Sequence, residues 1–272
     1  MTRFILLAPA LVLALASTFS AHAQQSSSGS ADDISRKLND PGAAMVSVPF
    51  QYNYLGDVGP GGDAHNEQLK IQPVIPFVGE HGKFLLRPIL PLQWNDYPQR
   101  KHGTGDLFVQ GYYIPTHAGA PSPTEIGFGA AALLDTASHD SLGTGKYSVG
   151  PAFVLIHKTG HWTIGALANH VWSFAGDSDR DDVSLTSMQP FFTRQLQKGW
   201  SISFTSEAQY NWEASSGNAW TVPLGGTVSK VVRFGHIPVS FGLGGFYNVE
   251  RPEFTNRWTG RFLVTLAFPE SH

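Results

Sequence analysis

Stretches of roughly ten residues in which apolar and polar side chains alternate run through most of this chain. In the stretch from Trp200 to Trp212 the even positions are apolar apart from Ser206, and all the odd positions are polar. Successive side chains of a strand point to opposite faces, so each stretch predicts a strand with one apolar and one polar face. We predict about twelve strands, with ten or fourteen also compatible with the pattern. They are 44–55, 68–78, 84–95, 105–115, 124–134, 146–157, 161–173, 183–195, 199–212, 219–232, 236–249 and 257–268.

The tryptophans stand at the ends of these stretches. Trp162 and Trp172 bracket one stretch, and Trp200 and Trp212 bracket another. The spacing within each pair is even, so both rings of a pair lie on the same face of a strand. Ten residues at about 3.3 Å each, in strands tilted by about 40–45°, rise close to the height of the apolar band of an outer-membrane barrel. Indole prefers the boundary between membrane and water, so the pattern predicts a membrane-interface girdle. The predicted girdle consists of Trp94, Trp162, Trp172, Trp200, Trp212, Trp220 and Trp258.

The connections between predicted strands alternate between short turns and longer polar loops. Short turns on the periplasmic side and longer loops outside are typical of an all-β, transmembrane, antiparallel up-and-down β-barrel of the outer membrane. An even number of strands leaves both termini in the periplasm. Several prolines fall inside predicted strands, and because each removes a backbone donor we expect them at bulges, strand ends or barrel rims. They are Pro49, Pro73, Pro76, Pro88, Pro91, Pro151, Pro190, Pro223 and Pro238.

The beginning of the chain has the features of an export signal. Arg3 precedes an apolar run from Phe4 to Ala16, and Ala21-His22-Ala23 fits a cleavage site, so residues 1–23 are predicted to be a cleaved signal peptide. No later stretch reaches the roughly 20 apolar residues of a membrane-spanning helix. We predict a periplasmic N-terminal leader at 24–43, a single barrel domain at 44–268 and a short tail at 269–272.

Composition removes several classes of chemistry. The chain has no cysteine, which excludes disulfides and thiolate metal sites. Its formal net charge of −3 and its isoelectric point near 6.4 argue against nucleic acid as a partner. The acidic run Asp177–Asp182 lacks the glycine and glutamate of an EF-hand loop, and Gly143–Lys146 lacks the first glycine of a phosphate loop, so we interpret both as loops or turns. No metal or cofactor is expected.

Several segments carry a resemblance to a known bacterial family. They are Pro41–Asn53, Ile71–Phe77, Leu142–Pro151, Ile164–Asp177, Gln189–Phe191, Val228–Lys230 and Pro238–Gly242. In this order they resemble predicted outer-membrane barrels that are often labelled transporter or "neuromedin U", and they are similar to the putative barrels of the MetA pathway of phenol degradation. The resemblance implies a barrel in the outer membrane of a Gram-negative bacterium, and solute transport. Such a protein contacts membrane lipid and lipopolysaccharide, and the barrel-assembly machinery inserts it. The chain departs from many barrels in ending Phe268-Pro269-Glu270-Ser271-His272 instead of on an aromatic residue.

Opposite the aromatic face, the polar positions are predicted to line the lumen. This lining comprises Lys70, Gln72, Arg87, Gln93, Glu207, Gln209, Asn211, Arg257, Thr259 and Arg261. We interpret it as a narrow, somewhat basic channel for small polar or anionic solutes, in which Arg87, Arg257 and Arg261 set the charge preference.

Other interpretations of the same residues stay open. The lining residues could form an internal network that fills a structural or surface-interaction barrel, and residues 24–43 could plug it. A second alternative is an outer-membrane enzyme, but Asn169 and Ser173 would face the lumen while His170 faces lipid, so we expect no catalytic site. His157 and His161 flank a turn without further ligands. A third alternative is a soluble periplasmic β-protein.

Overall fold

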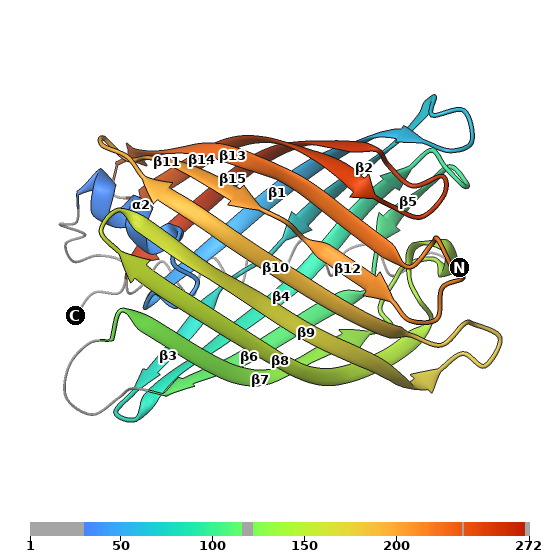
Figure 1. The fold of residues 1–272 in the computed structure, drawn as a ribbon, viewed down its shortest axis with the longest axis horizontal. Coiled ribbons are helices and arrows are strands. Elements are labelled where there is room, and N and C mark those ends of the chain that lie inside the picture. The colour runs from blue at the N-terminus through green and yellow to red at the C-terminus, as the bar shows by residue number, and fades with distance from the viewer. Residues whose placement is uncertain (1–29, 116–121, 236, 270–272) are drawn as a thin grey trace.

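The computed structural model describes residues 30–115, 122–235 and 237–269 and shows a closed, antiparallel, all-β barrel of twelve strands (Figure 1). Three of the twelve strands are interrupted, which gives fifteen strand elements. The elements are α2 (Ala31–Leu38), β1 (Met45–Val58), β2 (Ala64–Ile71), β3 (Ile75–Gly79), β4 (Gly82–Asn95), β5 (Lys101–Thr104), β6 (Leu107–Pro115), β7 (Thr124–Leu134), η1 (Asp140–Leu142), β8 (Lys146–Thr159), β9 (Trp162–Gly176), β10 (Ser184–Gln195), β11 (Trp200–Thr205), β12 (Ala208–Asn211), β13 (Trp220–Phe234), β14 (Ile237–Glu250) and β15 (Trp258–Pro269).

Strands that are consecutive in the chain pair with one another around the barrel, and β1 pairs with β15 to close it. Closure leaves no long sheet edge open, which is what a spanning sheet needs in lipid. Each predicted strand corresponds to one strand of the barrel, with ends that shift by a few residues. The expected fold class is therefore confirmed. Among the described residues, no helix is long and apolar enough to cross a membrane.

Proline accounts for the three interrupted strands. The break between β2 and β3 contains Pro73, and the register of these strands on β4 places it opposite Pro88. Pro91 lies opposite the break between β5 and β6, and Pro190 lies opposite the break between β11 and β12. Because proline has no backbone N–H to donate, the ladder ends on one side of it and resumes on the other. The expectation that prolines occupy irregular positions holds at these breaks.

The two ends of the barrel differ. At the turn end, short turns join β3 to β4, β8 to β9 and β10 to β11, and α2 lies at this end beside the start of β1 (Figure 1). At the loop end, longer segments join β7 to β8, β9 to β10 and β14 to β15. The predicted signal peptide, the first residues of the leader and residues 270–272 lie outside the described residues.

The outer face is apolar and exposed. Phe128, Phe153, Phe204 and Leu243 are each more than half exposed, an arrangement that an aqueous protein avoids and a lipid-facing surface requires. All seven tryptophans lie on this face, between 37% and 60% exposed. Trp162 and Trp200 are at the turn end. The other five, Trp94, Trp172, Trp212, Trp220 and Trp258, are at the loop end.

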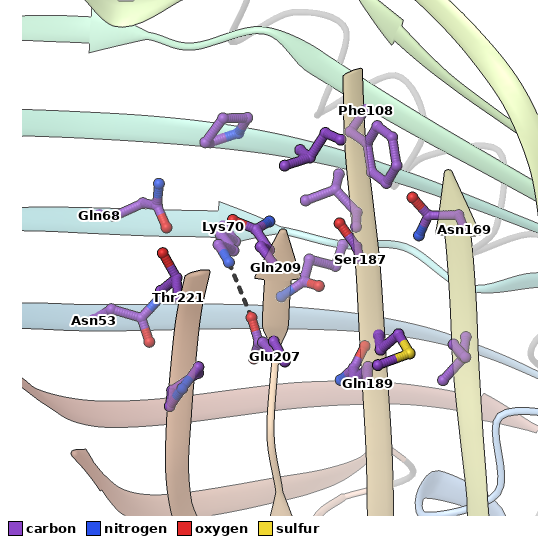
Figure 2. A pocket seen from close by; sticks show the side chains of 18 of the residues that line it. Asn53, Gln68, Lys70, Phe108, Asn169, Ser187, Gln189, Glu207, Gln209 and Thr221 are labelled. Carbon is purple, nitrogen blue, oxygen red and sulfur yellow. Dashed lines mark hydrogen bonds and ion pairs between the residues drawn. The ribbon is translucent and has the colours of Figure 1, made fainter. Parts of the chain in front are cut away.

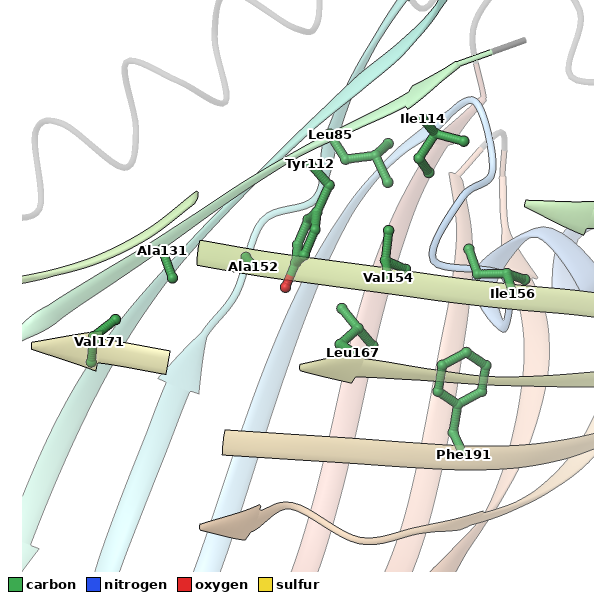
Figure 3. Packing of buried hydrophobic residues seen from close by; sticks show 10 residues of the cluster. All are labelled: Leu85, Tyr112, Ile114, Ala131, Ala152, Val154, Ile156, Leu167, Val171 and Phe191. Carbon is green, nitrogen blue, oxygen red and sulfur yellow. The ribbon is translucent and has the colours of Figure 1, made fainter. Parts of the chain in front are cut away.

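A second apolar group lies inside the barrel, on the strands from β4 to β10 (Figure 3). Its members are buried side chains from alternate positions, so each strand presents apolar residues to both lipid and the interior. They are Leu85, Tyr112, Ile114, Ala131, Ala152, Val154, Ile156, Leu167, Val171 and Phe191. One wall of the interior is therefore apolar.

Close strand packing gives a first testable prediction. A Cβ atom at Gly150 in β8 would overlap the carbonyl oxygen of His170 on β9, whereas a Cβ at Gly245 in β14 would meet no atom within 4 Å. Gly150→Ala should lower the free energy of unfolding by about 1–3 kcal/mol, because the backbone must shift to admit the methyl group. Gly245→Ala is the matched control. Urea titrations of both variants refolded into lipid would show this, and equal midpoints would contradict it.

Candidate functional site

The loop-end half of the lumen holds a cavity of about 450 Å³, which we call the loop-side cavity (Figure 2). Polar side chains come from strands on all sides of the barrel, because inward positions alternate with lipid-facing ones. They are Asn53, Gln68, Lys70, Gln72, Arg87, Asp106, Gln110, Asn169, Ser187, Gln189, Glu207, Gln209, Thr221, Asn248, Asn256, Thr259 and Arg261.

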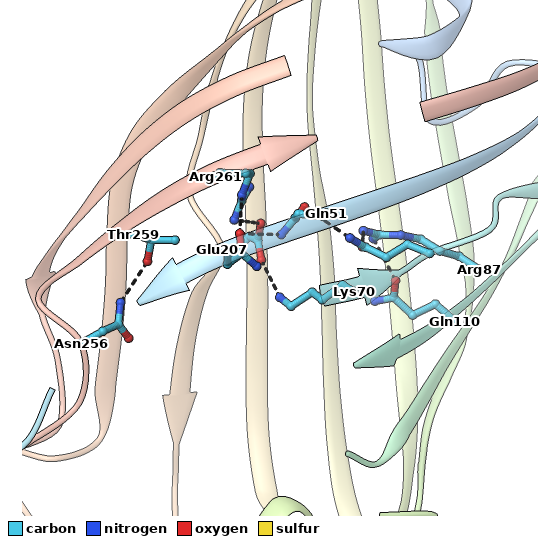
Figure 4. A network of polar contacts seen from close by, with 10 residues as sticks. Gln51, Lys70, Arg87, Gln110, Glu207, Asn256, Thr259 and Arg261 are labelled. Carbon is cyan, nitrogen blue, oxygen red and sulfur yellow. Dashed lines mark hydrogen bonds and ion pairs between the residues drawn. The ribbon is translucent and has the colours of Figure 1, made fainter. Parts of the chain in front are cut away.

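All the charged residues of this cavity except Asp106 form one cluster, centred on Glu207 (Figure 4). Glu207 lies in the break between β11 and β12, and its carboxylate accepts from Lys70 Nζ at 3.2 Å and pairs with Arg261 Nη2 at 2.8 Å. Arg261 Nε also donates to Asn53 Oδ1 at 2.9 Å. One carboxylate therefore shares two cations that come from β2 and β15.

Arg87, on β4, continues this network with neutral partners. Its guanidinium donates to Gln72 Oε1 at 2.8 Å and to Gln110 Oε1 at 3.1 Å. Gln72 in turn donates to Gln51 Oε1 at 3.2 Å. None of the ion pairs found among the described residues includes Arg87. The cluster of Lys70, Arg87, Arg261 and Glu207 thus carries more positive than negative charge.

A second cavity of about 240 Å³, the turn-side cavity, lies nearer the turn end of the barrel than the first. Four side chains line both cavities and mark the waist of the lumen: Gln72, Arg87, Leu167 and Gln189. Arg87 comes from the polar wall and Leu167 from the apolar wall, so the lumen between the two cavities has one charged and one apolar side. A solute that crosses the barrel must pass between them.

Residues 30–43 of the N-terminal leader occupy the turn-end mouth of the barrel. Ser30 caps α2 by accepting from the backbone N–H of Asp33, and its hydroxyl donates to the Asp33 carboxylate, which lowers the pKa of that carboxyl group. Ile34 of α2 is buried against Met45, Val231 and Ala267. The residues after the helix line the turn-side cavity, which places the leader across the path of a solute.

Polar contacts fasten the leader to β8, β10 and β11 at the mouth. On the side of β10 and β11, Ser35 Oγ donates to Gln195 Oε1 at 2.9 Å and Asn39 Nδ2 donates to Ser201 Oγ at 3.2 Å. On β8, separated from β10 by β9 alone, Lys158 Nζ pairs with Asp40 at 2.6 Å.

The Lys158 side of the mouth contains two further ion pairs. Glu125 accepts from Lys158 at 3.0 Å and from Lys83 at 2.8 Å, and Lys83 also donates to the carbonyl of Gly42. These ion pairs lie on β4, β7 and β8 and are remote from α2. The leader is therefore held across the full width of the mouth.

The loop end is narrowed by the segment that joins β7 to β8. Asp106, in the break between β5 and β6, accepts from the backbone N–H groups of Thr136, Ala137 and Thr144. Gln93 donates to the carbonyl of Leu142 in η1 at 3.0 Å. These contacts fold the segment inward over the mouth.

An ion pair holds the next loop beside this segment. Lys146 Nζ lies 3.0 Å from Asp182 and, with a hydrogen bond from Ser173, lowers the pKa of that carboxyl group. Arg180 of the same loop donates to the carbonyls of Gly143 and Thr144. The acidic run Asp177–Asp182 is thus part of a loop that is tied to its neighbour.

Most of the residues predicted to line the lumen meet around one cavity. Lys70, Gln72, Arg87, Glu207, Gln209, Thr259 and Arg261 line the loop-side cavity. The other three lie outside both cavities. Gln93 holds η1, Asn211 accepts from the backbone N–H of Glu213 at a strand end, and Arg257 donates its backbone N–H to Gly56.

The sequence pattern missed residues that connect the cluster. Gln51, Asn53 and Gln110 sit at inward positions of predicted strands, so their alternation with lipid-facing neighbours was the available signal. Asp106 and Gln189 lie at or opposite strand breaks, where the alternation is interrupted. The leader was expected as a possible plug, but its anchoring residues have no recognisable motif.

The residues weighed for catalysis or metal binding do not meet in one site. His170 contacts Thr186 and stacks near Trp172 on the outer side, whereas Asn169 lines the loop-side cavity and Ser173 bonds Asp182. Within the described ranges, no three histidine, aspartate or glutamate residues are placed to hold a metal ion.

Comparison with known proteins finds similarity only at the level of fold. No family model matches the chain, and no curated protein matches it. The COG4313 outer membrane channel from Pseudomonas putida F1 superposes with a TM-score of 0.64 at 13% identity, over 83% of this chain and 96% of that one. The NanC porin superposes with a TM-score of 0.53 at 10% identity, over 82% of this chain and 98% of that one. The chain therefore shares its barrel fold with solved outer-membrane channels and porins.

Proposed function

We propose that this protein is an outer-membrane channel of a Gram-negative bacterium through which small anionic or polar solutes diffuse passively. The observation that carries the proposal is the charge of the loop-side cavity, where Lys70, Arg87 and Arg261 outnumber the two carboxylates, Glu207 and Asp106. A water-filled passage lined by excess positive charge attracts anions and repels cations.

The apolar outer face and the barrel fold support the membrane location. Loops longer than the turns point to the loop end as the external one, so solute would enter there and leave past the leader at the turn end. Membrane lipid, lipopolysaccharide and the barrel-assembly machinery are the partners that follow from such a location. Two solved structures of similar fold, the COG4313 channel and the NanC porin, are a channel and a porin, which favours transport over catalysis. A link to phenol degradation stays a prediction from the sequence resemblance.

The narrowed mouths favour low conductance. The leader crosses the turn end and the segment between β7 and β8 folds over the loop end, so the open path is smaller than the barrel itself. We propose that the leader restricts passage and that the barrel is a narrow channel instead of a wide pore.

Reversal potentials in a KCl gradient test the charge preference. Replacing Arg87 and Arg261 together by glutamine should lower the ratio of chloride to potassium permeability toward unity, because two of the three cations in the cluster disappear. Arg257→Gln is the matched control, since Arg257 lies outside both cavities, and should leave the ratio unchanged. Unchanged reversal potentials for the double variant would overturn an anion-selective lumen.

A further inference from the structure

The waist of the lumen combines a buried cation with a buried hydroxyl that has no partner. Arg87 lines the turn-side cavity together with Tyr112 of β6, which is only 1% exposed. The hydroxyl of Tyr112 makes no hydrogen bond with any described residue. A buried polar group is normally satisfied, so this hydroxyl has an unused hydrogen bond next to the cavity. Its oxygen is itself buried, so the tyrosine ring must turn before the hydroxyl can donate to a ligand in the cavity.

The strand register places these two groups side by side. Arg87 is opposite Gln110 and Leu85 is opposite Tyr112 in the pairing of β4 with β6, so Arg87 and Tyr112 are diagonal neighbours on the inner face. Diagonal neighbours on one face of a sheet are about 7–8 Å apart at their Cα atoms, within reach of long side chains. Both side chains can donate hydrogen bonds, and a carboxylate has two oxygens that accept them.

One wall of this cavity is apolar, whereas the leader and the strands β10 and β11 contribute polar side chains, among them Lys37, Asp40 and Thr193. Leu85, Val154, Leu167 and Phe191 line the apolar wall, and all four belong to the apolar group inside the barrel (Figure 3). A small inorganic anion would leave these side chains in contact with water, whereas a solute with an apolar body would bury their apolar surface on binding. The cavity volume of about 240 Å³ admits a body of one ring or a short branched chain.

We propose that the waist is a binding site for small organic monocarboxylates with an apolar body. The carboxylate would accept from the guanidinium of Arg87 and the hydroxyl of Tyr112, while the body packs against Leu167 and Phe191. This inference rests on the proposed channel function and adds the class of solute to it.

Benzoate is the probe, and two ligands are its matched controls. Benzyl alcohol keeps the ring but has no charge, and formate keeps the carboxylate but has no apolar body. The full mature protein in lipid nanodiscs is titrated with each ligand by calorimetry, and the same ligands are added to single channels that carry chloride. Benzoate should bind and reduce the chloride current, and both controls should do so at least tenfold more weakly.

Variants of Arg87 and Tyr112 test whether benzoate binds at the waist. Arg87→Met should weaken benzoate binding by about 10- to 100-fold and Tyr112→Phe by about 3- to 10-fold, because each removes donors to the carboxylate. Arg194→Met makes the same chemical change on the outer face, where Arg194 stacks on Trp162, and should bind benzoate like the wild type. Heat-modifiable gel migration shows whether each variant folds. If Arg87→Met does not fold, Arg87→Lys, which retains the charge, serves as the second test. Arg87→Lys should bind benzoate more weakly than the wild type.

The outcomes separate this inference from the channel function. Anion-selective current without benzoate binding overturns the inference and leaves the channel. Benzoate binding that Arg87→Met weakens, in a protein without current, supports the site and overturns the channel. Equal binding of benzoate, benzyl alcohol and formate, or benzoate binding that neither waist variant alters, overturns the site.

Discussion

Removal of residues 24–43 is expected to raise the single-channel conductance severalfold. The leader lines the turn-side cavity and is fastened to β8, β10 and β11 and, across the mouth, to Lys83 of β4, so its loss widens the turn-end mouth. The strands need not change, because none of their ladders includes a leader residue before Met45. Planar-bilayer recordings of the mature protein and of a variant that begins at Ala44 would measure the difference.

A tethered leader is the control for this truncation. Asn39 and Ser201 are in contact, and the chain has no native cysteine, so Asn39→Cys with Ser201→Cys introduces a unique pair. A short bifunctional thiol reagent should then hold conductance at its low level. Equal conductance of the truncated and full-length proteins would show that the leader does not restrict the path.

The second large effect is expected from Glu207→Gln. Glu207 is the partner of both Lys70 and Arg261, so the substitution leaves two largely buried cations without a carboxylate. We expect the free energy of unfolding to fall by roughly 2 kcal/mol, since hydrogen bonds to charged groups contribute about 1.5–3 kcal/mol and water in the cavity screens part of the loss. The permeability ratio should shift further toward chloride.

The double variant Glu207→Gln with Arg261→Gln isolates the pair. It removes one charge of each sign, so the permeability ratio should return toward that of the wild type. Urea unfolding in lipid and KCl reversal potentials, measured on the same preparations, report both effects. A Glu207→Gln protein with unchanged stability and selectivity would contradict a role for the ion pairs in the lumen.

The strands could be predicted from sequence because each strand contacts lipid on one face and the lumen on the other. Lipid outside and a polar lumen inside require alternate side chains to differ, and the segment from 124 to 134 is recovered with the same ends in sequence and structure. The stretch from Trp200 to Trp212 was predicted as one strand and is two, β11 and β12, because Pro190 on the neighbouring strand cannot complete the ladder there. A proline can end the ladder of a strand to which it does not belong.

The lumen was harder to predict than the strands. Alternation identifies which residues point inward, but not their position along the barrel axis. Lys70 and Arg261 could therefore be predicted to line the lumen, but Glu207 could not be predicted to be the partner of both. Nor does alternation reveal that inward positions from β6 to β10 are mostly apolar on one wall. The contacts of the leader depend on side chains more than a hundred residues away, as for Ser35 and Gln195.

Each of the three proline-associated breaks places a polar inward residue in the lumen: Gln72 between β2 and β3, Asp106 between β5 and β6, and Glu207 between β11 and β12. At these positions the backbone is already released from regular pairing. Substitutions there disturb fewer ladder bonds than substitutions within a paired strand. Lineages that carry this barrel could therefore diversify what the interior accepts while the lipid-facing shell stays under constant selection, and the same breaks are the first places to randomise when the barrel is engineered for a new solute.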